Sequence, residues 1–174
     1  MSFRSHTRRL RAVAAVALAV LAAVPAVSAS AASVDAQAPT LTRNEVLTRA
    51  QRWVDRKVPY NQGAYFEGYR TDCSGYVSMA WKLSNSETTP TLPYFSFRIA
   101  KADLQPGDIL LNTSPGNAGH VTIFHKWANT AKTEYWAYDE SGRKTMGRAA
   151  YRKITYPYTP GHGTFNPYRS NKLR

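Results

Sequence analysis

The chain has 174 residues, and its 23 Lys plus Arg against 11 Asp plus Glu give a formal net charge of +12 at pH 7. Hydrophobic residues make up 43% of the sequence and charged residues only 20%, which excludes a wholly disordered chain. The single cysteine, Cys73, excludes an intramolecular disulfide framework and every zinc site that needs two or more thiolates.

Residues 1–29 have the pattern of a secretory signal peptide. Four arginines precede an apolar run at residues 12–24, and small residues follow it. We expect cleavage after Ala29, or as late as Ala32, and a secreted protein that is extracellular or associated with the cell wall. Removal of the four arginines leaves a charge of about +8, and no second apolar segment predicts membrane insertion of the mature chain.

The mature chain is expected to begin with a short flexible tail at residues 30–40, followed by a single domain at residues 41–174. Thr42 and Glu45 form a capping box, which predicts a helix that starts at Thr42 and stops before Pro59. One face of this helix is apolar and consists of Val46, Leu47, Ala50, Trp53 and Val54.

A second helix is predicted after an aromatic loop at residues 60–70. The motif Asp72-Cys73-Ser74-Gly75-Tyr76-Val77 places a good N-cap, Asp72, directly before Cys73. If the helix runs to about Leu83, Cys73 shares an apolar face with Val77, Ala80 and Trp81 and points inward. The positive end of the helix dipole would then favour the thiolate form of Cys73.

The second half of the chain predicts strands. Residues 84–102 are rich in turn formers and predict no regular element. Apolar or alternating segments follow at residues 109–111, 120–125, 133–139 and 152–156. Their close spacing is typical of an antiparallel meander, so the order of helices first and strands second predicts an α+β fold.

A cysteine nucleophile needs a base, and the mature chain offers three histidines. His120 opens the second strand, and side chains alternate along a strand, so His120 and His125 face opposite ways. His125 is expected to be a partly solvated residue at the strand end, and His162 lies in a Pro-Gly-His-Gly loop. We therefore select His120 as the candidate base.

A polar group usually holds the second nitrogen of such a histidine. Asp139 and Glu140 stand at the polar end of the next strand and face opposite ways, so only one of them can point at His120. The sequence alone leaves the choice open. Three separated histidines and one cysteine make no recognisable ligand set, so no metal or organic cofactor is expected.

Three ordered motifs resemble those of the NlpC family of papain-like cysteine peptidases of the bacterial cell wall. They are Asp72-Cys73-Ser74-Gly75-Tyr76-Val77, Pro106-Gly107-Asp108-Ile109-Leu110 and Gly119-His120-Val121. The resemblance implies a papain-like fold, in which the cysteine at a helix N-terminus packs on an antiparallel sheet that carries the histidine. It also implies hydrolysis of amide bonds in peptidoglycan stem peptides, often between D-glutamate and a diamino acid.

The resemblance assigns roles to individual residues. Cys73 would be the nucleophile, His120 the general base and then acid, and Asp139 or Glu140 the orienting group. Tyr60 matches a family tyrosine that helps to stabilise the oxyanion together with the Cys73 backbone amide. The chain departs from the family where Asn61-Gln62-Gly63-Ala64 replaces a usual Trp-Gly-Gly stretch, and where an acid replaces the usual His, Asn or Gln.

The sequence therefore predicts a secreted cysteine hydrolase of peptidoglycan stem peptides. Two alternatives remain open: an acyltransferase that uses the same site, and a non-catalytic cationic protein that binds the cell wall. The expected partners are peptidoglycan and anionic cell-wall polymers. No nucleic acid is expected, because the Lys and Arg residues are scattered and form no run of five, and we expect a monomer.

Overall fold

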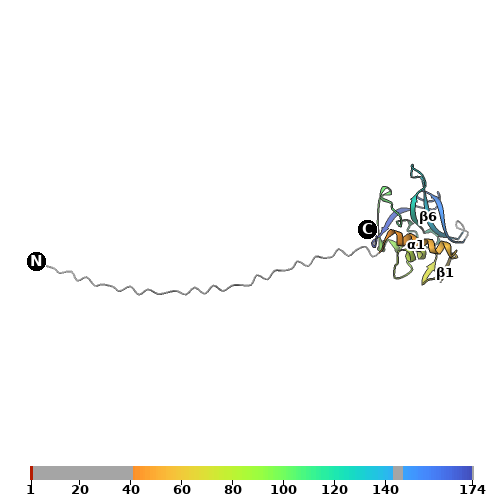
Figure 1. Ribbon diagram of the computed structural model, residues 1–174, viewed down its shortest axis with the longest axis horizontal. Coiled ribbons are helices and arrows are strands. Elements are labelled where there is room, and N and C mark those ends of the chain that lie inside the picture. The colour runs from red at the N-terminus through yellow and green to blue at the C-terminus, as the bar shows by residue number, and fades with distance from the viewer. Residues whose placement is uncertain (2–40, 143–146, 174) are drawn as a thin grey trace. The chain divides into compact units, whose positions relative to one another are not determined.

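The computed structural model describes Met1 and residues 41–142 and 147–173 (Figure 1). The predicted signal peptide at residues 1–29 and the predicted tail at residues 30–40 therefore lie outside the described residues, apart from Met1. All helices and strands below belong to the unit Ala36–Arg174. Within the described ranges, no helix is both long enough and apolar enough to cross a membrane.

The first helix, α1, spans Arg43–Asp55 and begins as predicted. The Thr42 hydroxyl accepts a hydrogen bond from the Glu45 backbone N–H at 3.1 Å, and the Glu45 carboxylate accepts one from the Thr42 N–H at 3.3 Å. This capping box satisfies two N–H groups at the start of the helix. Its residues Val46, Ala50 and Trp53 are fully buried, as the apolar pattern predicts.

The second helix, α2, spans Cys73–Ala80, and all eight of its residues are buried. It ends earlier than the predicted Leu83, because Lys82 adopts a positive φ of 51° that no helix continues through. The Trp81 indole N–H donates to the Gly107 carbonyl at 2.9 Å and fixes this end of the helix to the turn before the sheet. A helix that is buried on every side leaves Cys73 little freedom to move.

Six antiparallel strands form the sheet, in the order β3-β8-β4-β5-β6-β7. The predicted meander is confirmed, with these bounds: β4 Ile109–Asn112, β5 His120–Trp127, β6 Glu134–Ser141 and β7 Arg148–Thr155. The sequence missed β8, Asn166–Ser170, and β3, Ser96–Arg98, the latter in a segment predicted to hold no regular element. Both strands are short and lack a clean alternation of apolar and polar residues.

The prediction of a loop at residues 60–70 is wrong. This segment forms a hairpin of β1, Asn61–Phe66, and β2, Tyr69–Thr71. The β1 strand is mostly exposed, so its sequence carries no hydrophobic pattern that would identify a strand. Three short 3-10 helices complete the described structure: Leu92–Phe95, Lys101–Asp103 and Gly116–Ala118.

Each face of the sheet covers a separate core. The two helices pack on one face, against side chains that include Ile109, Val121 and Ile123. The opposite face holds a second core that includes Phe124, Tyr135 and residues of the loop after β7. The result is the α+β arrangement that the sequence predicts, with the cysteine at the N-terminus of a helix packed on an antiparallel sheet.

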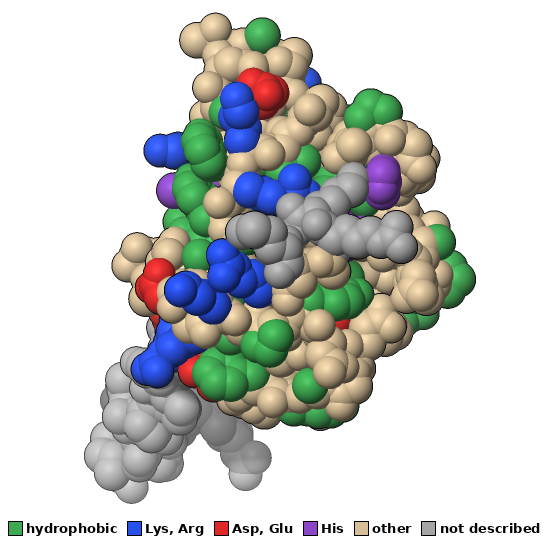
Figure 2. Space-filling view, turned by 90° about the vertical axis from the view of Figure 1, so that its right-hand side faces the viewer, with side chains coloured by type: hydrophobic (Ala, Val, Ile, Leu, Met, Phe, Trp, Pro, Cys, Tyr) green, Lys and Arg blue, Asp and Glu red, His purple; other side chains and the backbone are tan. Residues whose placement is uncertain are grey.

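Basic side chains are prominent on one face of the protein. On the face shown in Figure 2, Lys and Arg side chains follow a band down one side and across the middle, whereas Asp and Glu form only small separate spots. The positive net charge is therefore presented to solvent on this face.

Candidate active site

Cys73 is held at the start of α2 by its neighbours in the motif. The Asp72 carboxylate accepts a hydrogen bond from the Gly75 backbone N–H at 2.7 Å and forms an ion pair with Arg70. A Cβ atom at Gly75 would lie 1.9 Å from the Arg70 carbonyl oxygen, so only glycine lets β2 approach α2 this closely. Cys73 itself is 9% exposed and lies at the floor of a cleft.

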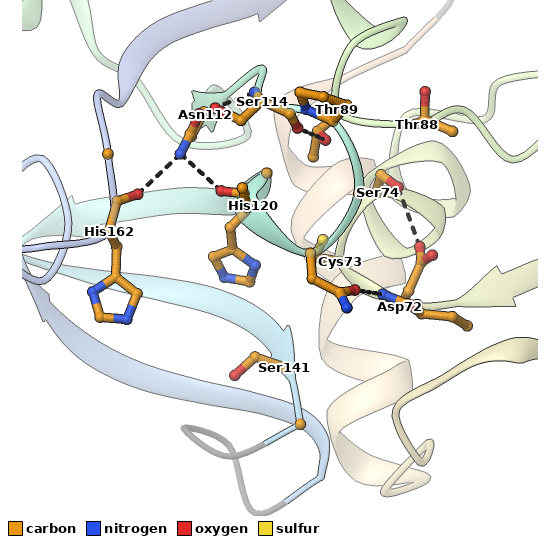
Figure 3. Close-up of a pocket in the computed structure, with 18 of the residues that line it drawn as sticks. Asp72, Cys73, Ser74, Thr88, Thr89, Asn112, Ser114, His120, Ser141 and His162 are labelled. Atoms are coloured by element: carbon orange, nitrogen blue, oxygen red, sulfur yellow. Dashed lines mark hydrogen bonds between the residues drawn. The ribbon is translucent and has the colours of Figure 1, made fainter.

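His120 is the first residue of β5, and its ring lies beside the Cys73 side chain (Figure 3). A glycine is again required next to it, because a Cβ atom at Gly119 would lie 2.0 Å from the Ser114 carbonyl oxygen. Both side chains line the same cleft, and Cys73 is among the groups that raise the pKa of His120. The structure therefore brings together the cysteine and the histidine that the sequence analysis selected.

Of the two acids left open by the sequence, only Asp139 contacts His120. Its Oδ1 atom lies 2.8 Å from His120 Nε2, which leaves Nδ1 of the ring for Cys73. Glu140 is the next residue of β6 and therefore points to the opposite face of the sheet, toward the helices. Cys73, His120 and Asp139 thus form one line of contacts, whereas Glu140 takes no part in it.

The surroundings of His120 favour its protonated form. Burial on its own lowers the pKa of His120, but the charge of Asp139 and its hydrogen bond outweigh this effect. The hydrogen bond with Cys73 and the charge of the thiolate act in the same direction and raise the pKa of His120 to about 10. At neutral pH the His120 ring is therefore an imidazolium.

Asp139 is completely buried, yet it remains ionised. Burial alone would raise the pKa of Asp139, but the His120 imidazolium and the Arg152 guanidinium hold it below its usual value. Arg152 extends from β7 and donates to Asp139 Oδ2 at 2.7 Å from Nε and 2.5 Å from Nη2. Each carboxylate oxygen of Asp139 therefore has its own cationic donor.

The sequence analysis did not identify Arg152 or Tyr158 as site residues. The Tyr158 ring covers His120 with ring centroids 5.1 Å apart, and its hydroxyl accepts a hydrogen bond from Arg152 at 3.2 Å. The sequence does hold one indication for Arg152. An arginine inside a predicted strand, next to apolar residues, needs an anionic partner if it is buried. No local pattern distinguishes Tyr158 from the other aromatic residues of its loop.

Tyr60 lies in the wall of the same cleft as Cys73. Its hydroxyl oxygen accepts a hydrogen bond from Gln62 Nε2 at 3.0 Å, so the phenolic proton is available to another acceptor. Burial raises the pKa of Tyr60, the bond from Gln62 opposes this, and the charge of Cys73 adds to the rise. Tyr60 therefore carries its proton at neutral pH and can donate it to an oxyanion.

The cleft has a volume of about 1470 Å³ and is lined mainly by uncharged polar groups and glycines. Loops at residues 88–90, 114–119 and 161–163 form its walls around Cys73 and His120 (Figure 3). Asn112 joins two of these loops, because its Nδ2 atom donates to the Ala118 carbonyl at 3.0 Å and to the His162 carbonyl at 2.9 Å. These two hydrogen bonds hold the walls of the cleft together on the side of His162.

The two remaining histidines lie away from the Cys73 sulfur. His125 is half-buried near the end of β5, as the sequence predicts for a partly solvated residue, and its Nδ1 lies 2.8 Å from the Tyr151 hydroxyl. Burial, followed by the charge of Lys126, lowers the pKa of His125. His162 is exposed in its loop at the rim of the cleft.

Glu140 is a buried acid of an unusual kind. It is fully shielded from solvent, and neither of its carboxyl oxygens has a hydrogen-bond partner within residues 41–142 and 147–173. Burial, followed by the negative charges of Asp72 and Cys73, raises the pKa of Glu140 to about 9. Glu140 is therefore a neutral acid at pH 7, in the core beneath the cysteine.

Among residues 41–142 and 147–173, no group of three or more His, Cys, Asp or Glu side chains is placed to hold a metal ion. The arrangement of Cys73, His120 and Asp139 supplies a nucleophile, a proton carrier and an orienting carboxylate. These three roles are sufficient for acyl transfer.

Solved structures that are similar to this chain include the following two. The NlpC/p60 domain of the peptidoglycan hydrolase SagA is 17% identical and has a TM-score of 0.42, over 64% of this chain and 89% of that one. A Staphylococcus aureus protein described as similar to a lipoprotein of the NLP/P60 family is 19% identical, again with a TM-score of 0.42, over 63% of this chain. The chain covers 40% of the length of that second structure.

No protein-family model matches the chain. No curated protein matches it either. Both similar structures are named for the family that the three sequence motifs resemble.

The neutral state of Glu140 makes a prediction about stability. Between pH 4.5 and 9 the unfolded chain loses the Glu140 proton while the folded chain keeps it, so this residue lowers stability as pH rises. Glu140→Gln lacks this pH dependence. We therefore expect its free energy of unfolding to rise relative to that of the wild type by up to about 1.4 kcal/mol for each pH unit in this window. Urea unfolding at a series of pH values measures the difference.

Glu134→Gln is the matched control, since Glu134 lies on the same strand but pairs with Lys153 at the surface. A difference between Glu140→Gln and wild type that stays constant from pH 4.5 to 9 would show that Glu140 is already ionised in the folded protein.

Proposed function

We propose that the protein is a secreted cysteine hydrolase that cleaves amide bonds in peptidoglycan stem peptides. The observation that carries this proposal is the place of His120, which lies beside Cys73 in a large cleft and binds Asp139 through Nε2 (Figure 3). The substrate class rests on the resemblance of three ordered sequence motifs to the NlpC family. The signal-peptide pattern and the basic surface agree with a site of action at an anionic cell wall.

In the proposed reaction the Cys73 thiolate attacks the carbonyl carbon of the scissile amide. A C–S bond forms, and the carbonyl π electrons move to oxygen. The Tyr60 hydroxyl and the Cys73 backbone N–H donate hydrogen bonds to this oxyanion, at a helix N-terminus where the first N–H groups lack intrahelical partners. The tetrahedral intermediate then collapses, and the C–N bond breaks.

His120 supplies the proton that the leaving amine needs. As an imidazolium it transfers the Nδ1 proton to the amine nitrogen and becomes neutral, and the acyl group remains on Cys73 as a thioester. A water molecule then attacks the thioester while His120 takes up one of its protons. The C–S bond breaks, and the thiolate and imidazolium are restored. Asp139 holds the ring orientation through Nε2 in both steps.

We expect the mature protein to release stem-peptide fragments from purified peptidoglycan. Cys73→Ala and His120→Ala should each reduce this release by at least about a thousandfold, because each variant removes a group that forms or breaks bonds. Mass spectrometry of the soluble products identifies the fragments and the cleaved bond. His125→Ala serves as the control, since His125 lies on the opposite face of the sheet and contacts Tyr151.

Intact peptidoglycan with the folded wild-type protein would contradict the hydrolase proposal. New products in which the acyl group is joined to an added amine would then identify an acyltransferase. Unchanged binding of the wall by Cys73→Ala, without any product from the wild type, would identify a non-catalytic binding protein.

The basic surface makes a second prediction. If its charge attracts the protein to anionic wall polymers, binding of Cys73→Ala to purified cell walls should weaken strongly between low salt and 1 M salt, where the screening length falls to about 3 Å. A sedimentation assay of bound and free protein measures this. Binding that is the same at both salt concentrations would show that the charge does not direct the protein to the wall.

A further inference from the structure

Arg152 contacts two groups that touch the catalytic histidine, and the proposed mechanism gives it no role. Through Nε and Nη2 it binds Asp139 Oδ2, and through Nη2 it also donates to the Tyr158 hydroxyl. Asp139 binds His120 through its other oxygen, and the Tyr158 ring covers the imidazole. Arg152 is therefore linked to His120 indirectly in two ways, through Asp139 and through Tyr158.

The sheet register explains why Arg152 reaches Asp139. Strands β6 and β7 pair so that Asp139 lies opposite Ala150 and Ala137 lies opposite Arg152. Arg152 is therefore the diagonal neighbour of Asp139 on the same face of the sheet. Its side chain is only 23% exposed, so the ion pair is largely removed from water. Burial of a guanidinium in this position costs free energy unless an anionic partner compensates its charge.

The charges of the site change during the proposed reaction. At rest, the Cys73 thiolate and Asp139 balance the His120 imidazolium and Arg152. After acylation the thiolate is consumed and His120 is neutral, so Arg152 is then the only cation, among the described residues, in contact with the Asp139 carboxylate. Without Arg152, a fully buried carboxylate would face only a neutral N–H, and it would compete with the imidazole for the proton.

We propose that Arg152 is a positioning residue that keeps the catalytic proton on His120 by holding Asp139 as a carboxylate. This inference rests on the proposed function, since it assigns Arg152 a part in the same proton transfer. Arg152 touches neither the Cys73 sulfur nor the place of the scissile bond, so it acts through Asp139 and Tyr158. A lysine in its place offers one compact donor and cannot bind the carboxylate through two nitrogens.

Other titratable groups around Asp139 keep their protons at acid and neutral pH. Glu140 has a raised pKa of about 9, and burial raises the pKa values of three nearby tyrosines. These tyrosines are Tyr135 on β6, Tyr76 on α2 and Tyr158 after β7. These groups therefore do not produce a change in the acid part of a pH profile.

The test is the rate of Cys73 alkylation by iodoacetamide between pH 3.5 and 9, in the full mature chain. In Arg152→Gln, Asp139 takes up a proton at higher pH and stops stabilising the imidazolium, which in turn stops stabilising the thiolate. We expect the acid limb of the alkylation profile to move up by about one pH unit or more. Arg152→Lys should move it by about half as much. The matched control, Lys153→Gln, removes a charge from the exposed side of the same strand and should not move it.

An acid limb in folded Arg152→Gln that coincides with that of the wild type would overturn the proposal, even if the variant is less stable or reacts more slowly at every pH. If Arg152→Gln does not fold, Arg152→Lys decides, and a profile that coincides with the wild type overturns the proposal. Urea unfolding confirms that each variant is folded over the pH range used.

Alkylation needs no peptidoglycan, so the two proposals can fail separately. A shifted acid limb in a protein that releases no stem peptides would support the role of Arg152 and contradict the hydrolase. Stem-peptide release by a wild type whose alkylation profile matches that of Arg152→Gln would support the hydrolase and overturn the role of Arg152.

Discussion

The site depends on one buried carboxylate. Asp139 has no access to solvent, and its two oxygens are divided between His120 and Arg152. Because both partners are cations, the carboxylate keeps its charge in a place where a lone acid would be neutral. Glu140, one residue along the same strand, shows that alternative: no cation among the described residues pairs with it, and its pKa rises to about 9. Two adjacent acids with similar burial thus differ in charge because only one of them has cationic partners.

The fold supplies the rigidity that this pairing needs. The helix α2 is buried on every side, so the Cys73 sulfur is fixed relative to the sheet that carries His120 and Asp139. Glycines at 75 and 119 allow the backbone of β2 and of the 114–119 loop to approach the catalytic residues more closely than any side chain would permit. The three motifs that suggested the function therefore also matter for packing. Two of them contain a reactive residue, Cys73 or His120. In the third, the Gly107 carbonyl accepts the hydrogen bond that fixes the end of α2.

Much of the fold follows from the sequence, because buried elements carry a periodic pattern. The helices and the four strands of the meander were predictable for this reason, whereas the hairpin of β1 and β2 is too exposed to show one. Cys73 and His120 were identified from their local context. The choice between Asp139 and Glu140 could not be made from the sequence, because alternation shows only that the two side chains face opposite ways. The pairing of β5 with β6 decides which of them contacts His120. Arg152 depends in the same way on the register of β6 with β7.

The central claim is that His120 is an imidazolium held between Cys73 and Asp139. Nitrogen NMR of the wild-type protein, labelled at its histidines, measures this directly as a function of pH. The account predicts that both ring nitrogens of His120 are protonated at pH 8 and that the ring titrates near pH 10, while His125 is already neutral. A His120 ring that loses its proton near pH 6.5, the ordinary value for histidine, would contradict the account, because the buried carboxylate would then not be stabilising a charge on the ring.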